Sequence, residues 1–504
     1  MGFADKVRLI RGDSLKAKSA RGVITLGIGT GVERTLRLVR QMLLTRLLLP
    51  DQFGLMAIIL IMVNVFEACT EVGIKQSVIQ NKRGADPEYL NATWWFQFIR
   101  AAGLFIFAIL AAPLVSSFYG KPHLLRLLQV SFLAIIFRGT ISPRAHVLLK
   151  EYKFGLSVLL IQGSALLGTI VTICMALYTQ NVWALVAGYV SEQAILCLLS
   201  YLLVPFVPKF SINREYLNEI FRFARNMFGL PILTLIGLGA PVFVLGKIVS
   251  EEKLGLYSLA GQLAGLPIIL FTKIINPVLL PGFSQKQDDR NSLYRIVLQI
   301  SRLVGAVTIP LVVFMATCAS GLLLLMWGRP EYVDVTIPCA VLILIIFPRT
   351  EEGILSATYI AVGQPQLHRR FVIFRMVIVL AIIYPAVIHL ELLGAAIVVV
   401  VGSYIPLLMQ IFWCRRVIPL KFDSYLRSYF PGLLMAFPVA LTIRLLLLFS
   451  IDSMILILTA GACVLVLTYA AYFGRIFIKK NHFAYTQLAG NQNTSKKTQI
   501  ELGS

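Results

Sequence analysis

Long apolar stretches separated by short polar connections make up almost the whole sequence. A helix needs about 20 apolar residues to cross a bilayer, and most of these stretches reach that length. The pattern therefore predicts an all-α polytopic membrane protein with about fourteen transmembrane helices. We expect these helices at residues 22–49, 54–76, 89–117, 124–149, 154–178, 182–204, 222–248, 254–281, 293–317, 334–362, 370–389, 391–413, 424–449 and 453–478. The apolar run 318–327 is too short to cross alone, so we expect it to continue the ninth span or to form a re-entrant end.

The composition argues for a membrane environment and against a soluble protein. Of the 504 residues, 58% are hydrophobic and 14% are charged, whereas charged residues make up about 25% of ordinary soluble domains. The net charge of +22 could indicate nucleic acid as a partner, but the basic residues lie in every second connection instead of in one patch. We therefore expect the basic residues to face membrane lipids and to bind no nucleic acid.

The connections between the predicted spans alternate in charge. One set, taken with the two termini, carries 26 Lys and Arg residues, and the other set carries only Lys121, Lys253 and Arg329. Because basic residues are retained on the cytoplasmic side, the rich set is expected to be cytoplasmic. This predicts an even number of spans, both termini in the cytoplasm, and a multi-pass protein of the cell inner (plasma) membrane.

Matching segments indicate an internal duplication with an offset of about six spans. The matches are 46–55 (RLLLPDQFGL) with 247–256 (KIVSEEKLGL), 100–103 with 302–305 and, at looser register, Arg138 with Arg349. Coincidence among apolar segments is the alternative explanation. Because an even number of spans separates the copies, a true repeat would give two parallel six-helix lobes related by an axis along the membrane normal, a plan used by transporters that alternate access.

This repeat divides the chain into five expected parts. They are a basic cytoplasmic N-terminus (1–21), an N-lobe with helices 1–6 (22–210), a C-lobe with helices 7–12 (211–416), helices 13–14 (417–480) and a polar cytoplasmic tail (481–504).

The first span carries a polar stripe. On a helical wheel, one sector about 120° wide holds Thr30, Glu33, Arg34, Arg37, Arg40 and Gln41, and the opposite arc holds Val32, Leu36, Val39, Leu43 and Leu47. One arginine near mid-bilayer costs at least about 3 kcal/mol, so the stripe must face water, counter-charges or an anionic ligand. The counter-charge alternative pairs Glu33 with Arg37 or uses acids of the second span.

Further basic residues recur deep in the predicted spans, and acids there are fewer. We expect Arg225 and Arg375 to extend to the lipid head groups. The remaining arginines and lysines suit a cationic cavity, because the planar guanidinium group binds phosphate and carboxylate oxygens. The candidate substrate-binding residues are Arg34, Arg37, Arg40, Arg138, Lys273, Arg302 and Arg349, and the candidate charge partners or coupling residues are Glu33, Glu67, Glu71 and Glu192.

Sequence signatures of catalysis are absent. The chain has no Walker lysine loop, no GxSxG, no HExxH and no paired histidines or CxxC, so we expect no enzyme activity, no metal site and no cofactor. Transport powered by ATP within this chain is excluded on the same ground.

The segment ERTLR (33–37), the run LLTRLLLPDQFGLMAI (43–58) and GIKQSVIQNK (73–82) together resemble the polysaccharide transporter family. These are the Wzx-type, and most closely WzxC-like, oligosaccharide flippases of the multidrug/oligosaccharidyl-lipid/polysaccharide (MOP) superfamily. The family's turn between spans 1 and 2 and the end of span 2 are matched by Arg46, Leu47, Leu49, Pro50, Phe53, Gly54, Leu55, Gln80 and Lys82. The resemblance covers residues 15 to about 480.

The resemblance implies a flippase for surface polysaccharide biosynthesis, such as exopolysaccharide or lipopolysaccharide. Its substrate would be an undecaprenyl-diphosphate-linked oligosaccharide repeat unit, moved from the inner to the outer leaflet by alternating access. Partners would be this lipid-linked anionic oligosaccharide and membrane lipids, and could include the polysaccharide polymerase and export machinery.

Three other functions stay open at this point. A lipid II flippase shares the basic cavity, and a cation-coupled small-molecule antiporter would use membrane acids, which here look paired with arginines. A membrane polysaccharide polymerase or ligase would be expected to have a large external loop, but every external connection here is short. A structural scaffold gives no reason to bury so many arginines.

Overall fold

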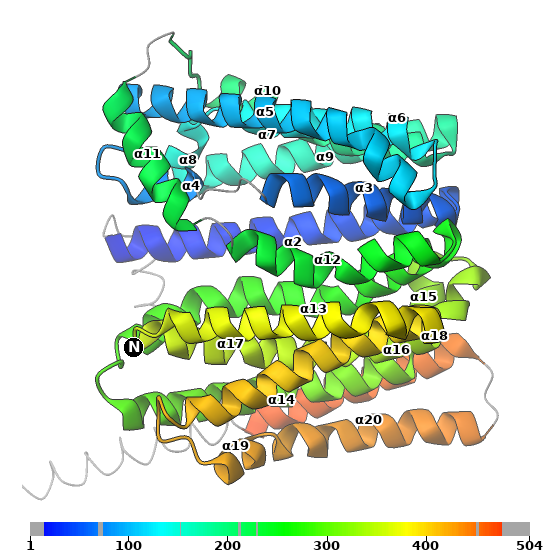
Figure 1. Cartoon of the computed structure of the whole chain (residues 1–504). Coiled ribbons are helices and arrows are strands. Elements are labelled where there is room, and N and C mark those ends of the chain that lie inside the picture. Colours follow the sequence, from blue (N-terminus) through cyan, green and yellow to red (C-terminus); the bar gives the residue numbers. More distant parts are fainter. Residues whose placement is uncertain are drawn as a thin grey trace, which may run out of the picture.

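The computed structural model describes residues 15–68, 74–151, 153–209, 213–227, 230–449 and 453–475. Over these residues the chain is a bundle of long helices that run roughly side by side, and it contains no β-strand (Figure 1). Some side chains within these ranges, including that of Lys273, lie outside the description.

The helices of the first half of the chain are α2 (Leu15–Leu47), α3 (Pro50–Ala68), α4 (Ile74–Gln80), α5 (Pro87–Tyr119), α6 (Leu124–Ser131), α7 (Leu133–Gly139), α8 (Arg144–Lys150), α9 (Phe154–Thr179), α10 (Val182–Leu203) and α11 (Arg214–Met227). Of these, α5, α9 and α10 begin and end within two residues of predicted spans, whereas the second and fourth predicted spans are each divided among shorter helices.

The second half contains the longest helices. They are α12 (Leu230–Ile248), α13 (Glu251–Ser284), α14 (Arg290–Thr317), α15 (Ala319–Trp327), the 3-10 helix η1 (Pro330–Val335), α16 (Thr336–Ile343), α17 (Ile346–Ala361), α18 (Pro365–Cys414), α19 (Phe422–Ser428), α20 (Phe430–Leu448) and a final helix, Met454–Arg475.

Multi-pass membrane character is confirmed, but the count of fourteen spans stays a prediction. Ten of the described helices are long and apolar enough to cross a bilayer, and a bent pair at Leu124–Gly139 and Arg144–Lys150 gives an eleventh. The 50-residue α18 covers the eleventh and twelfth predicted spans. Its backbone leaves the helical region at Glu391, where φ is 46° and ψ is −121°, which is where the sequence predicts a break.

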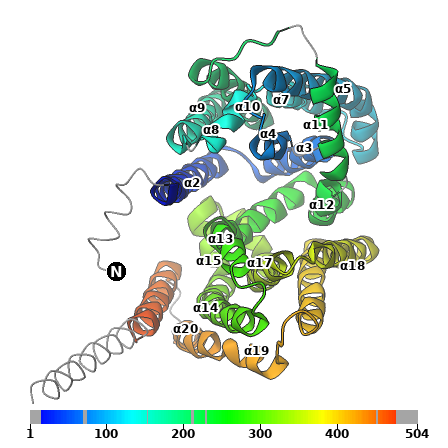
Figure 2. The same cartoon turned by 90° about the vertical axis from the view of Figure 1, so that its left-hand side faces the viewer.

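Helices of the two halves of the chain form two groups when the molecule is viewed along the helix axes (Figure 2). The linker helix α11 lies within the residues expected to begin the C-lobe. It packs against α4 and α5 of the first half of the chain instead. Arg83 holds it there through ion pairs of 3.3 Å to both Glu215 and Glu219, and the Glu215 carboxylate raises the pKa of the Arg83 guanidinium. The lobes themselves stay a prediction.

A reciprocal contact joins α3 and α13 where the sequence repeat is strongest. A Cβ atom on Gly54 would lie 2.0 Å from the Glu251 carbonyl oxygen, and a Cβ on Gly255 would lie 1.7 Å from the Pro50 carbonyl oxygen. The two contacts are equivalent in the repeat, in which Gly54 corresponds to Gly255 and Pro50 to Glu251, as expected around a two-fold axis. Only glycine allows two helix backbones to approach this closely.

Polar contacts between the two groups gather at the same end of the bundle. Lys121 Nζ and His123 Nε2 lie 2.8 and 3.1 Å from Glu251 Oε1, Lys247 donates to the Phe118 carbonyl, and Arg329 donates to the Arg46 carbonyl at 3.1 Å. Among the side chains that the structure describes, these are the hydrogen bonds and ion pairs that join residues 15–227 to residues 230–475. All these residues belong to or border the connections predicted to be external.

The helical hydrogen bonding of the fourth and tenth predicted spans is interrupted. In the fourth span the interruption lies between α6 and α7, at Phe132, ahead of a 56° bend between Gly139 and Arg144, and in the tenth it lies between α16 and α17, at residues 344–345. In each case the second segment carries a deep arginine, Arg138 on α7 and Arg349 on α17. The looser match between these two arginines in the sequence therefore has a structural counterpart.

Candidate functional site

The polar stripe of the first span faces the rest of the bundle. In α2, which packs on α9, Glu33 and Arg37 are half-buried, whereas Val32 and Val39 on the other face are exposed. Exposed apolar side chains on a membrane helix face lipid at little cost, so the wheel correctly separates the two faces of α2.

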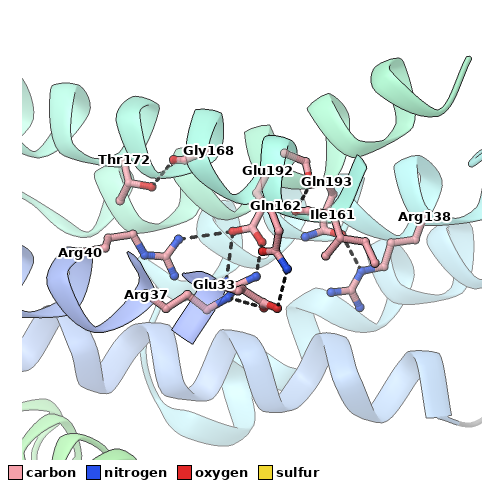
Figure 3. A network of polar contacts seen from close by, with 11 residues as sticks. Glu33, Arg37, Arg40, Arg138, Ile161, Gln162, Gly168, Thr172, Glu192 and Gln193 are labelled. Atoms are coloured by element: carbon pink, nitrogen blue, oxygen red, sulfur yellow. Dashed lines mark hydrogen bonds and ion pairs between the residues drawn. The ribbon is translucent and has the colours of Figure 1, made fainter. Parts of the chain in front are cut away.

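Glu192 of α10 is the centre of the contacts made by this stripe (Figure 3). Its Oε1 accepts a hydrogen bond from Arg37 Nη2 at 2.7 Å, and its Oε2 accepts one from Arg40 Nη1 at 3.3 Å. Arg37 Nε also donates to Glu33 Oε1 at 2.9 Å, and Gln162 Nε2 of α9 donates to Glu33 Oε2 at 3.4 Å. Two acids therefore neutralise two arginines across three helices.

The neighbouring residue on α10 reaches a second set of charges. Gln193 Oε1 accepts from Arg138 Nε of α7 at 2.9 Å, and Arg138 is ion-paired with Glu67 of α3. The Arg138 guanidinium also lies over the Tyr189 ring, with 5.8 Å between its carbon and the ring centroid. We call the combined set, Glu33, Arg37, Arg40, Glu67, Arg138, Gln162, Glu192 and Gln193, the N-terminal ion network.

Close packing of α9 on α10 positions Glu192. Asn181 caps α10 by accepting a hydrogen bond from the Trp183 backbone N–H, and Gln180 ends α9 in the left-handed conformation, with φ of 48°. Farther along the hairpin, a Cβ on Gly168 would lie 2.7 Å from the Glu192 Cβ. The small residue on α9 thus makes room for the carboxylate that binds α2.

A second group of charges lies in the other half of the molecule. Glu352 of α17 accepts hydrogen bonds from Arg375 Nη1 of α18 at 2.8 Å to Oε1 and 2.6 Å to Oε2, and from Arg349 Nη1 at 3.3 Å. We call Arg349, Glu352 and Arg375 the C-terminal ion cluster. The expectation that Arg375 extends to the head groups is wrong: the residue is buried, because the Glu352 carboxylate offers it a closer partner than lipid phosphate.

The other predicted site residues are not part of these groups. Arg302 is exposed on α14 and makes no hydrogen bond or ion pair within the described ranges, and the Arg34 Nε atom is buried without a hydrogen-bond partner. Glu71 and the side chains of Lys273 and Arg225 lie outside the described residues. Sequence reasoning did not select Gln162, Gln193 and Tyr189, whose only signal was a polar group inside an apolar span.

The arginines of the two groups are mostly paired with glutamates, whereas the sequence predicts a cationic cavity. In the N-terminal ion network three arginines face three glutamates, and Arg34 adjoins the network as a further positive charge. In the C-terminal ion cluster two arginines share one glutamate. Each of the two groups, with Arg34 counted in the first, therefore holds about one positive charge in excess. The paired arginines can bind an anion only if it competes with, or adds to, their carboxylate partners.

Comparison with known proteins gives matches over most of the chain. Residues 43–333 match the family model for polysaccharide biosynthesis proteins. The sequence is 22% identical to an uncharacterised membrane protein in the cps region of Klebsiella pneumoniae, covering 94% of this chain and 96% of the relative. It is 23% identical to the lipopolysaccharide biosynthesis protein WzxC of Escherichia coli, covering 63% of this chain and 64% of the relative.

Solved structures show the same fold. The lipid II flippase MurJ in its inward closed conformation superposes with a TM-score of 0.71 at 13% sequence identity, covering 90% of this chain and all of that chain. The fold expected for the MOP superfamily is thereby confirmed. Since the family model matches more than half of the sequence, the chain belongs to the family of polysaccharide biosynthesis proteins.

Proposed function

We propose that this protein is a flippase that moves an undecaprenyl-diphosphate-linked oligosaccharide repeat unit from the inner to the outer leaflet of the cell inner membrane. Support comes from the family, from a relative named for lipopolysaccharide biosynthesis, and from a fold shared with a flippase for another lipid-linked sugar. In this proposal the chain is a transporter and not an enzyme, it acts with both termini in the cytoplasm, and the polymerase receives its product.

The observation that carries the proposal is the partial exposure of the ion-paired arginines in the N-terminal network. The Arg37 and Arg138 side chains keep 30% and 34% of their surface exposed, although both lie within predicted membrane spans. An arginine exposed to lipid within a membrane span is costly, so the exposed parts of these two side chains are expected to face a water-filled cavity or a ligand. The exposed guanidinium edges can bind the oxygens of a diphosphate while the carboxylates hold the side chains in place.

The contacts between the two halves suit an alternating-access cycle in which the substrate enters from the cytoplasm. The Gly54–Gly255 contact and the surrounding ion pairs hold together the end predicted to be external. Separation of this end, with the two halves as the moving lobes, would release the headgroup outward. Helix α11 (Arg214–Met227) would move with the N-lobe, because it is held by Arg83.

The proposal is tested by the side of the membrane on which lipid-linked repeat units collect. Cells of the native host that lack this gene should accumulate units that a membrane-impermeant oxidant cannot reach from outside, and the wild-type gene should restore their exposure. Loss of a polymerase would instead leave single units exposed on the outer leaflet. Accumulation of externally reachable units in the deletion strain would contradict a flippase and support the polymerase alternative.

A further inference from the structure

Glu351, next to Glu352 on α17, lies in a separate and fully buried polar pocket. Its Oε2 accepts hydrogen bonds from Ser301 Oγ of α14 at 3.0 Å and from Tyr425 Oη of α19 at 2.8 Å. All three residues are completely shielded. Adjacent residues on α17 thus point in different directions, Glu352 to the arginines and Glu351 to hydroxyl groups.

Two polar atoms in this pocket have no hydrogen-bond partner in the described part of the chain. They are Glu351 Oε1 and the hydroxyl of Tyr429, whose ring packs edge-on against Tyr425 with centroids 5.3 Å apart. Buried polar atoms are almost always paired, so an unpaired carboxylate oxygen beside hydroxyl groups indicates that a proton, a water molecule or an ion completes the pocket.

The described charged groups around the pocket either pair with Glu352 or are exposed. On α17 itself, Arg349 is bonded to Glu352, and on α18 Arg375 is bonded to Glu352 as well. On α14, Arg302 is exposed; α19 contributes Tyr425, and α13 carries Lys273, whose side chain is not described. Within the described side chains no ion pair is made to Glu351.

We propose that Glu351, with Ser301 and Tyr425, forms a proton-binding site that is separate from both groups of arginines. An ionised carboxylate without a counter-charge is costly to bury, and two hydroxyl donors offset part of this cost. The site can therefore exist in two states, an ionised carboxylate held by two hydroxyl groups and a carboxylic acid with its proton on Oε1. Binding forms one O–H bond with a proton from the aqueous phase, and release returns that proton to it.

The position of the pocket links its occupancy to helix packing. The pocket lies where α14, α17 and the α19–α20 segment meet. Here α14 and α20 pack closely, because a Cβ on Gly432 would lie 2.3 Å from the Gly305 carbonyl oxygen. A Cβ on Gly305 would lie 2.6 Å from the Tyr429 ring. Because Glu351 and its two hydroxyl donors are fully shielded, we expect a proton to exchange when this seam loosens. Exchange restricted to one conformation is what coupling a proton gradient to transport requires.

The site is tested by infrared spectroscopy on the purified full-length chain in lipid nanodiscs. The carbonyl stretch of a protonated, buried carboxylic acid should grow as the pH is lowered, and this band should be missing from Glu351→Gln and retained in Glu252→Gln, which removes an exposed carboxylate. Glu351→Gln should fold, because an amide has the shape of the protonated acid. This readout needs no substrate, so it can fail or succeed independently of the proposed function.

Further variants keep the test decisive if Glu351→Gln does not fold. Tyr425→Phe and Ser301→Ala retain the carboxyl but each remove one donor to its ionised form, so the midpoint of the band's titration should move to higher pH. A band that depends on Glu351 but is constant at every pH, or no such band at any pH, would overturn the proposal. A band that disappears when NaCl replaces KCl at constant pH would assign the pocket to sodium and overturn the proton assignment.

Discussion

The N-terminal ion network and the C-terminal ion cluster use the same side chains in different ways. The network joins α2, α3, α7, α9 and α10 through six charged residues, and its Arg37 and Arg138 are about one third exposed. The cluster joins only α17 and α18, and its central pair, Arg375 and Glu352, keeps 10% and 12% of the side-chain surface exposed.

This difference separates a structural role from a binding role. Enclosed charges that satisfy one another stabilise the contact between two helices but offer nothing to a ligand. Paired charges with an exposed edge can take an additional anion. We therefore propose that Arg37 and Arg138 contact the substrate and that Arg375 holds α18 against α17.

The largest effect is expected from removing the shared acid of the C-terminal cluster. Glu352→Gln leaves two enclosed arginines without a counter-charge, which costs about 3 to 5 kcal/mol when a buried pair is broken. The yield of monodisperse protein in detergent, and its thermal midpoint, should fall sharply, whereas Glu252→Gln should match the wild type. Normal stability of Glu352→Gln would show that the cluster is as open to solvent as the N-terminal network.

A large effect on transport without loss of folding is expected at Arg37. Charged hydrogen bonds contribute about 1.5 to 3 kcal/mol each, so Arg37→Ala should reduce surface polysaccharide per membrane-inserted protein about 10- to 150-fold. Arg37→Lys should retain part of the output, because charge survives and the planar fork is lost. The folded protein should persist, since Arg40 still faces Glu192; a drop in inserted protein that matches the drop in output would make Arg37 structural.

A smaller effect is expected when the packing that positions Glu192 in the network is disturbed. Gly168→Ala places a methyl group against Glu192, and overpacking of this kind costs about 1 to 3 kcal/mol. Polysaccharide output should fall by less than in Arg37→Ala. The matched control is Gly163→Ala on the same helix, where the new methyl group would meet only the Leu199 Cδ1 atom, at 3.5 Å. Equal output from the two variants would mean that the position of Glu192 is unimportant.

The smallest effect is expected for an ion pair whose two side chains are both largely exposed. Arg427 and Asp423 pair at 3.0 Å with side chains that are 78% and 72% exposed, and exposed pairs contribute little. Arg427→Ala should leave both stability and output unchanged. A loss of output similar to that of Arg37→Ala would show that total positive charge, and not its place in the bundle, controls transport.

Much of the fold could be predicted from the sequence, because membrane spans depend on apolar length and charge alternation. The turn at Pro50 and Gly54 and its copy near Gly255 were visible as a repeat, although the contact between the two glycines was not. The chain's break at Glu391 also fell between two predicted spans.

The partners within the site were harder to predict. The helical wheel selected the polar face of α2, but Glu192 is 155 residues from Arg37, and no local pattern tells which distant helix brings the acid. Arg375 was misassigned for the same reason, since its position near a span end was visible and its neighbour Glu352 on another helix was not. The lone polar residues Gln162 and Gln193 become informative only once α9 and α10 are placed.

The most direct measurement of the central claim, that Arg37 binds an anionic headgroup, uses a charge-balanced double variant. Arg37→Gln with Glu33→Gln removes one positive and one negative charge and leaves Arg40 paired with Glu192. Surface polysaccharide should be quantified per membrane-inserted protein beside the single variant Arg37→Gln. If Arg37 contacts the substrate, the double variant stays as inactive as the single one; recovery to the wild-type level would mean that Arg37 serves only to neutralise Glu33.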